Sequence, residues 1–304
     1  MKLNVPMPFD DANLAEQFCS VEAVVQIGRT VEKAGFHAAM VTDHPCPTGR
    51  WLDAGGHHAQ DPFVMLALLG AVTTMLRLQT GLLVLPYRNP FVVARSVATL
   101  DRLSNGRMIL SVGAGYLKGE FRAVGADFNL RNTLMDEYMR ALKTSLSGGE
   151  FTFEGTGYQA FGNRIQPGPL QKPHPPLLVG GNSRRAIRRV VELGDAWNPF
   201  FTSADGIDTA TTRTAAMTGE ADLIAGIAYM KEYCGQVGRQ VLPKVVLGII
   251  TAPREKCSPQ ALVDRIGRYT ELGVEAAGLI VEGRSCNEWC DDAERLGGDV
   301  ISKI

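Results

Sequence analysis

Short apolar runs alternate with amphipathic segments along the whole chain, and this alternation most constrains the fold. The clearest unit spans residues 77–121, with an apolar run over 78–85, a helical stripe over 90–103 and a second apolar run over 108–112. Such short runs are typical of strands buried on both faces of a parallel sheet. The unit is therefore predicted to be β–α–β, and its second strand leads into the small residues 113–115.

Similar units continue on both sides of this one. Further strands are expected at 2–6, 36–42, 177–179, 195–201, 244–251 and 276–281. Further helices are expected at 20–35, 61–74, 131–146, 184–193, 221–237, 258–272 and 287–304. About eight alternations over this length predict an α/β chain folded as a single (β/α)₈ TIM-barrel domain, residues 1–304. A doubly wound open sheet is the alternative, but no GxGxxG follows the first strand.

Two segments interrupt the rhythm. Residues 148–176, after the fourth helix, combine Gly, Pro and aromatic residues with short alternating pieces, so an excursion that contains a hairpin is expected there. Residues 202–219 are rich in Thr, Ser, Ala, Asp and Gly, which favours a mobile loop.

Composition excludes several classes of protein. The formal net charge of −1 gives no basic surface for nucleic acid. No apolar run approaches the length of about 20 residues that spans a membrane. The six Cys residues form no CxxC pair and no signal peptide is visible, so a reducing, cytoplasmic location is expected.

The helix expected at 61–74 differs from the others. Asp61-Pro62 supplies an N-cap and a first-turn proline, and residues 63–72 are apolar almost all round. A helix without a polar face needs cover on both sides. The sequence therefore predicts a homodimer contact through this helix.

In TIM barrels the active site lies where the strands end at their carboxyl side. Gly180-Gly181-Asn182-Ser183 follows one strand and precedes a helix, so its backbone is a candidate for binding phosphate. A plain turn with Ser183 as N-cap explains the same residues. Gly283-Arg284-Ser285 is a rival anion site, or a second site for an anionic substrate.

His44 follows Asp43 at the end of the second strand and is the candidate proton donor or acceptor. The alternative is a structural histidine bonded to a carbonyl group. Glu120 is a candidate general acid or base, or a solvated loop residue. The pair His57-His58 is expected to be exposed and to bind no metal, because no third ligand stands at a fixed spacing.

Four segments resemble the bacterial luciferase-like monooxygenase superfamily. They are residues 34–44, 61–90, 99–121 and 173–199, and their order and spacing also fit that superfamily. The resemblance implies a barrel that binds FMN or the deazaflavin F420 at the strand ends, usually in a dimer. The segments LPYRNP and GAGYLKGEF are most similar to the F420-dependent branch.

The resemblance also implies roles for particular residues. His44 is expected to face the cofactor ring, and the segment 81–84 is expected to pack behind it, often with a non-proline cis peptide. Cofactor contacts are implied for Asp43, Gly81, Leu82, Leu83, Gly113, Ala114, Gly115, Gly180, Gly181, Asn182 and Ser183. The sequence departs from one F420-dependent group at Trp51. In that group a tryptophan follows the histidine closely, whereas Trp51 comes several residues after His44.

Three functions follow as hypotheses. The first is an F420-dependent oxidoreductase that moves a hydride between the reduced deazaflavin and a small organic substrate, with His44 and Glu120 as catalytic residues. The second is an FMN-dependent monooxygenase that uses O₂ and reduced flavin from a separate reductase. The third is a non-catalytic flavin-binding protein. Substrate contacts are expected from Phe9, Trp51, Tyr87, Tyr116 and Arg284.

Overall fold

Eight parallel strands form a closed barrel in the computed structural model, which describes residues 1–203, 210, 213–251 and 255–304. The barrel strands are β1 (Lys2–Pro6), β2 (Ala38–Val41), β3 (Arg77–Thr80), β5 (Met108–Gly113), β8 (Leu177–Gly180), β9 (Ala196–Asn198), β10 (Lys244–Leu247) and β11 (Val274–Gly278). β1 pairs with β2 and β11, and the pairing of β3 with β5 closes the ring. The predicted (β/α)₈ barrel is confirmed.

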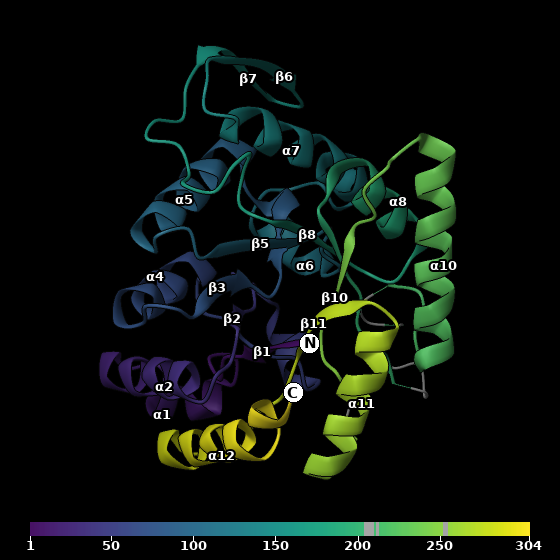
Figure 1. Ribbon diagram of the computed structural model, residues 1–304. Coiled ribbons are helices and arrows are strands. Elements are labelled where there is room, and N and C mark those ends of the chain that lie inside the picture. The colour runs from purple at the N-terminus through teal and green to yellow at the C-terminus, as the bar shows by residue number, and fades with distance from the viewer. Residues whose placement is uncertain (204–209, 211–212, 252–254) are drawn as a thin grey trace.

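Eight longer helices surround the barrel among the described residues (Figure 1). They are α2 (Val21–Lys33), α4 (Pro62–Val72), α5 (Pro90–Leu103), α7 (Arg131–Leu146), α8 (Arg184–Leu193), α10 (Glu220–Val237), α11 (Pro259–Glu271) and α12 (Cys286–Asp299). Side-chain N-caps explain where six of them begin, because each cap oxygen accepts a first-turn N–H group. The caps are Ser20, Asp61, Asn89, Ser183, Ser258 and Ser285.

Short elements occupy the loops. They are α1 (Ala15–Phe18), α3 (Gly49–Asp53), α6 (Lys118–Ala123), η1 (Ala12–Leu14), η2 (Leu85–Tyr87), η3 (Phe128–Leu130) and η4 (Ile301–Lys303). α3 and α6 follow β2 and β5, so both lie on the side of the barrel where the strands end. No helix among the described residues is both long enough and apolar enough to cross a membrane.

The strand predicted over 78–85 is split in two. β3 ends at Thr80, a cis peptide bond joins Gly81 to Leu82, and β4 (Leu83–Val84) continues the pairing with β5. The strand predicted over 195–201 is also shorter, because β9 ends at Asn198. β4 thus stays in the sheet beside β5, whereas the chain after Asn198 leaves it at the carboxyl end of β9.

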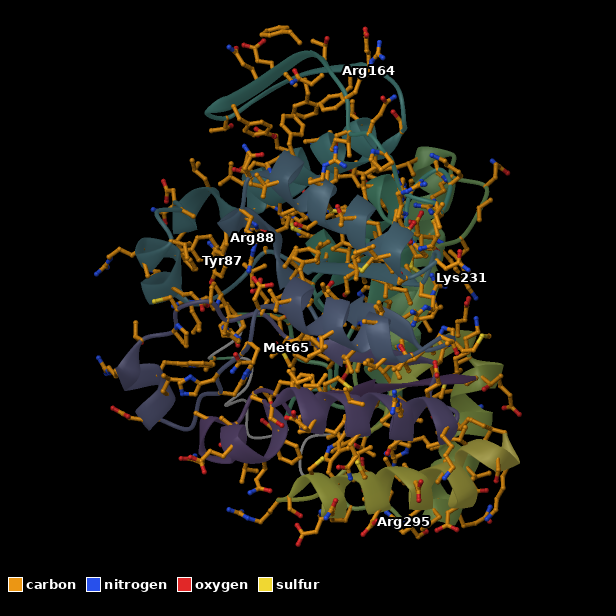
Figure 2. The ribbon with its side chains drawn as sticks, turned by 90° about the vertical axis from the view of Figure 1, so that its left-hand side faces the viewer. Met65, Tyr87, Arg88, Arg164, Lys231 and Arg295 are labelled. Carbon is orange, nitrogen blue, oxygen red and sulfur yellow. The ribbon has the colours of Figure 1, made fainter. Side chains whose placement is uncertain are left out.

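Within the excursion 148–176, β6 (Phe151–Gly155) and β7 (Tyr158–Asn163) form an antiparallel hairpin beside α7 (Figure 1). Phe91 of α5 contacts the ring of Phe151 at 5.1 Å between centroids, which anchors the hairpin to the barrel. Arg164 lies beyond the hairpin, at the top of Figure 2. Residues 204–209 and 211–212 of the mobile loop predicted over 202–219 lie outside the described residues.

The core has two parts. The larger one lies between the strands and the helices, and a smaller cluster lies inside the barrel. The inner cluster consists of Ala38, Ile109, Leu178, Ala196, Val246 and Ala276. Both faces of the strands are therefore buried, which is why they read as continuous apolar runs.

Candidate active site at the carboxyl ends of the strands

His44 lies just beyond β2 and is only 6% exposed. Its Nδ1 lies 3.0 Å from Oε2 of Glu120, and its Nε2 lies 3.3 Å from the hydroxyl of Tyr116. The partner of this imidazole is thus a carboxylate and not a carbonyl group. Because an ionised carboxylate only accepts hydrogen bonds, Nδ1 carries the donated proton and Nε2 is the atom that exchanges protons.

The Glu120 carboxylate is fully buried at 0% exposure in α6. It accepts hydrogen bonds from the Cys46 N–H at 3.0 Å and the Tyr87 hydroxyl at 2.9 Å, besides that from His44. Burial raises the pKa of Glu120, but the bonds from His44 and Cys46 outweigh it and the pKa is lowered. Glu120 is therefore a charged carboxylate that accepts three hydrogen bonds and not a solvated loop residue.

Both tyrosines of the site remain protonated. Burial and then the nearby Glu120 charge raise the pKa of Tyr87, and the same two causes raise the pKa of Tyr116 to about 12. A neutral phenol beside a carboxylate donates its hydrogen bond. Tyr87 therefore orients Glu120, while Tyr116 faces the exchanging nitrogen of His44.

Asp43 holds the backbone next to His44. Arg88 donates two hydrogen bonds to its carboxylate, at 2.7 and 2.8 Å, and the Val84 N–H donates a third at 2.8 Å. Tyr87 and Arg88 lie together on the left-hand side of the molecule in Figure 2. Asp43 thus binds the segment after the Gly81–Leu82 peptide to the end of β2, and its predicted cofactor contact stays a prediction.

The loop over residues 49–60 folds back onto His44. Trp51 of α3 lies 5.0 Å from the His44 ring between centroids, and His57 lies 4.7 Å from it at an interplanar angle of 78°. The expectation of an exposed His57 is wrong, because the ring packs on His44 and Trp51. The His58 N–H donates to the Asp10 carbonyl oxygen at 2.9 Å and ties the loop to the end of β1.

The glycines after β5 and β8 make room for Leu82. A Cβ atom on Gly113 would lie 2.5 Å from Cδ1 of Leu82, and one on Gly180 would lie 2.3 Å from its Cδ2. Gly115 has a φ of +74°, which L-residues rarely adopt. Gly113 and Gly180, which were predicted to let a ligand approach, therefore make room for the Leu82 side chain in this structure. Leu83 is buried and Ala114 is half-buried.

The segment Gly180–Ser183 forms a tight turn. The Gly181 N–H donates to the Asn198 carbonyl, the Asn182 N–H donates to Thr214 Oγ1, and the Asn182 side chain donates to the Phe200 carbonyl. Ser183 accepts a bond from the Ala186 N–H as the N-cap of α8. The predicted phosphate-binding role of this segment stays a prediction, and the segment also serves as the N-terminal turn of α8.

The sequence interpretation missed a group of basic residues around Phe128. Relative to that ring centroid, Lys118 Nζ lies at 5.3 Å, Arg131 Cζ at 3.9 Å and Arg213 Cζ at 5.5 Å. Arg122 lines a pocket that Lys118 and Phe128 also line. We call these four residues the Phe128 cation group. None of them forms an ion pair with a carboxylate within the described part of the chain.

This group is electrostatically unusual. Burial, and then the charges of Arg213 and Arg185, lower the pKa of Arg131. Neighbouring like charges disfavour one another unless an anion lies between them. Thr214, next to Arg213, binds the Asn182 N–H, so the group adjoins the Gly180–Ser183 segment. Lys118 and Arg122 stand four residues apart, which places both on one face of a helix. This spacing was the signal in the sequence from which part of the Phe128 cation group could have been predicted.

Two predicted substrate residues lie elsewhere. Phe9 is buried in the hydrophobic core. Arg284 is exposed, and its backbone N–H donates to Glu288 in the capping box of α12. Neither has a recorded contact with His44 within the described residues, so their roles stay predictions. No cluster of three or more metal-ligating side chains occurs in the described part of the chain.

The barrel and the buried histidine–carboxylate pair at its rim are those of a TIM-barrel enzyme with acid–base groups at the carboxyl ends of its strands. Residues 2–230 match the family model described as luciferase-like monooxygenase. The chain belongs to this family.

Three known proteins illustrate the relationship. The FMNH(2)-dependent dimethylsulfone monooxygenase of Pseudomonas putida is 31% identical over 157 residues, which are 51% of this chain and 42% of that protein. The monooxygenase RslO1 of Streptomyces bottropensis has a TM-score of 0.78 at 15% identity, covering 99% of both chains. The coenzyme F420-dependent tetrahydromethanopterin reductase of Methanopyrus kandleri has a TM-score of 0.71 at 16% identity, covering 99% of this chain and 98% of its own. At these identities the two structures show the fold alone.

Proposed function

We propose that the chain is an F420-dependent oxidoreductase that transfers a hydride between the reduced deazaflavin and a small organic substrate. The observation that carries the proposal is the His44 imidazole, fixed through Nδ1 by Glu120 with Nε2 free to exchange a proton at the barrel rim. When bound, the reduced deazaflavin would supply the hydride. His44 would supply the accompanying proton from Nε2.

The residues around His44 have defined tasks in this proposal. Glu120 stabilises the protonated imidazole and fixes its orientation, as a carboxylate behind a histidine does in other acid–base sites. Tyr87 and the Cys46 N–H hold Glu120 in place. Trp51 covers the imidazole and limits the access of water.

The Phe128 cation group supports a cofactor with an anionic tail. Three cations around one ring, without carboxylate partners among the described residues, favour a phosphate or several carboxylates. The first turn of α8 adds N–H groups that favour negative charge. These residues therefore fit the tail of F420, which carries a phosphodiester and glutamate carboxylates, and they would bind it by charge and hydrogen bonds.

An FMN-dependent monooxygenase is the second candidate, favoured by the similarity to the FMNH(2)-dependent enzyme of Pseudomonas putida. Its phosphate would fit the same cations. Such an enzyme would use O₂ and would need a separate reductase as partner. Oxygen consumption in the presence of reduced FMN distinguishes this candidate from the first.

The binding experiment titrates the purified chain with F420 and with FMN and follows cofactor fluorescence. We expect F420 to bind at micromolar concentration or below. Arg131→Gln should weaken binding by about 10- to 150-fold, since a charge-assisted bond contributes about 1.5 to 3 kcal/mol. The matched control is Arg140→Gln, on the same helix, which should bind like the parent chain. Binding of neither cofactor would overturn the proposal.

The catalytic experiment uses His44→Gln. We expect this variant to bind F420 like the parent chain but to transfer hydride at least about 100-fold more slowly, the usual contribution of a general acid. His58→Gln, in the nearby loop, is the control. A non-catalytic flavin-binding protein would show no turnover in any of these variants. The substrate contacts predicted for Trp51, Tyr87 and Tyr116 would be mapped with the same assay.

We also propose that a second copy of the chain covers α4 and α5. Val64 is 66% exposed and Met75, just beyond α4, is 78% exposed, while Val92 and Leu103 of α5 are also exposed. Leu66 and Leu69 point inward, so α4 presents apolar side chains on opposite sides. The two helices lie next to one another on the barrel (Figure 1). This surface supports the predicted homodimer.

A further inference from the structure

A cavity lies inside the barrel at the end opposite to His44. Lys2, Arg77 and Lys244, which line it, are the first residues of β1, β3 and β10, whereas His44 follows the end of β2. The cavity volume is about 130 Å³, and a water molecule takes up about 30 Å³ in the liquid. The amino-terminal end of the barrel therefore has room for a small organic molecule.

One wall of this cavity is apolar. Bulky branched residues usually fill the inside of a TIM barrel, but Ala196 of β9 and Ala276 of β11 are too small to do so. This wall offers a bound molecule no hydrogen-bond partner, whereas a buried water needs about two to four of them. The wall consists of Ile109, Leu178, Ala196, Val246 and Ala276.

Two amide side chains also line the cavity. Asn4 of β1 and Gln79 of β3 are each only 1% exposed. β2 lies between these two strands, and its small Ala38 leaves room for the amides to meet across it. Nδ2 of Asn4 donates to Oε1 of Gln79 at 3.1 Å. The inside of the barrel thus carries a buried polar pair facing an apolar wall.

Each of these amides keeps one buried atom without a hydrogen-bond partner among the described residues. The two atoms are Oδ1 of Asn4 and Nε2 of Gln79. Exchanging oxygen and nitrogen in both amides leaves the same balance, one free acceptor and one free donor. Buried polar groups are nearly always satisfied, as Ser111 and Asn198 are, which bond to each other at 2.9 Å. The last torsions of Asn and Gln are broad, so both amides can turn their free atoms into the cavity.

The charges at the mouth of the cavity largely compensate one another. Glu275 pairs with Lys244 at 2.8 Å and with Lys2 at 3.6 Å. Arg77 is the third cationic side chain of the lining, and Asp195 is a second anionic one. An ion inside would also exchange its hydration for the apolar wall, which is costly. The site therefore favours an uncharged molecule.

We propose that this cavity is a binding site for a short-chain primary amide. The carbonyl oxygen of the ligand accepts a hydrogen bond from Nε2 of Gln79, and its NH₂ group donates to Oδ1 of Asn4. Its short alkyl group contacts the apolar wall. Because the cavity lies at the other end of the barrel from His44, this inference does not depend on the proposed function.

The first experiment adds acetamide to the cofactor-free chain and follows the side-chain NH₂ signals of Asn4 and Gln79 by NMR. We expect both signals to shift and to saturate. The signal of Gln26, an exposed amide bonded to Asn287, should stay in place. Acetate has a similar shape but is charged and donates no hydrogen bond, so it should not compete. Equal binding of acetate and acetamide would overturn the proposal.

Variants test the two sides of the site, with binding followed through the backbone signals of β1 and β3. Asn4→Leu combined with Gln79→Met replaces both amides by apolar groups of similar shape, a change that can be nearly neutral for stability. It should weaken acetamide binding by at least about 10-fold, because two hydrogen bonds are lost. Ala276→Val keeps the amides but fills part of the cavity, and should also weaken binding. Gln26→Met, the matched control, should bind acetamide like the parent chain, and unchanged affinity in both cavity variants would contradict the assignment.

A crystal structure of the chain soaked with acetamide identifies the occupant directly. We expect acetamide bonded to Asn4 and Gln79. Water alone on both amides would mean that solvent satisfies them, and xenon bound there under pressure would mean that the cavity behaves as an apolar one; either result overturns the proposal. None of these measurements uses F420, so a negative result leaves the proposed function standing.

Discussion

The guanidinium of Arg88 holds both oxygens of the Asp43 carboxylate, at 2.7 and 2.8 Å, one residue before the imidazole of His44. The pair joins the end of β2 to the entry of α5. The Val84 N–H donates to the same carboxylate, so β4 is joined as well. His44 therefore occupies its place because the residue before it is bound on two sides.

Arg88→Gln should destabilise the chain strongly. It would leave the Asp43 carboxylate, which is almost completely buried, without its cation, and breaking a buried ion pair in this way costs about 3 to 5 kcal/mol. The free energy of unfolding, measured with urea, checks this value. Arg95→Gln is the control, since Arg95 donates only to exposed backbone carbonyls and its loss should cost less than about 1 kcal/mol. Equal losses in both variants would show that the pair has no special role.

The barrel could be predicted from the sequence because its physical signals are local. Buried parallel strands read as short apolar runs, and the helices carry caps and stripes at regular spacing. The strand ends were less predictable. The segment 78–85 is uniformly apolar, and composition does not reveal that the chain turns at Gly81 and leaves β3.

The site could be predicted only in part. His44 was found because it follows a predicted strand, and residues in that position meet at the barrel rim. Its contact with Glu120 joins residues 76 positions apart, and neither spacing nor periodicity reports such a distance. Trp51 and His57 return to His44 through a polar loop, which has no periodic signal at all. The Phe128 cation group likewise comes from separate parts of the chain.

Gly180→Ala should displace Leu82. The added Cβ would lie 2.3 Å from Cδ2 of Leu82 and 3.5 Å from the Val112 carbonyl oxygen, so the leucine must move. We expect a loss of about 1 to 3 kcal/mol in the free energy of unfolding, the usual cost of overpacking, together with weaker F420 binding. Thermal or urea unfolding and the fluorescence titration measure the two effects.

A double variant tests the stated cause. Leu82→Ala removes the atoms that the new methyl group meets, so Gly180→Ala should cost less in that background. Gly298→Ala is the control, because a Cβ there meets nothing within 4 Å and lies in α12, where alanine is favoured over glycine by up to about 1 kcal/mol. Additive costs for positions 82 and 180 would contradict the proposed contact.

His37 should make the chain less stable in acid. Burial, and then the charges of Lys2 and Arg77, lower the pKa of His37 from 6.5 to about 4. The unfolded chain therefore binds a proton that the folded chain does not bind between these values. Stability is constant above about pH 6.5 and falls as the pH drops towards 4. After allowance for partial exposure, we expect a loss of roughly 1 to 2 kcal/mol.

The measurement compares urea unfolding at about pH 7 and about pH 4.5 in the parent chain and in His37→Gln. Carboxyl groups also titrate in this range, so the difference between the two chains isolates the histidine. The variant should lose less stability on acidification. His58→Gln should behave like the parent chain, and an equal acid loss in all three chains would show that His37 does not contribute.

Val64→Lys should convert the proposed dimer into a monomer. Val64 is 66% exposed on α4, and a charged side chain there would have to be buried without a partner in a symmetric contact, which opposes association. Light scattering after gel filtration should give about twice the chain mass for the parent and the single-chain mass for the variant. Val241→Lys, equally exposed but remote from α4, should remain dimeric. A monomeric parent chain, or a dimeric Val64→Lys variant, would place the contact elsewhere or remove it, because the apolar surface over α4 and α5 is what supports the dimer.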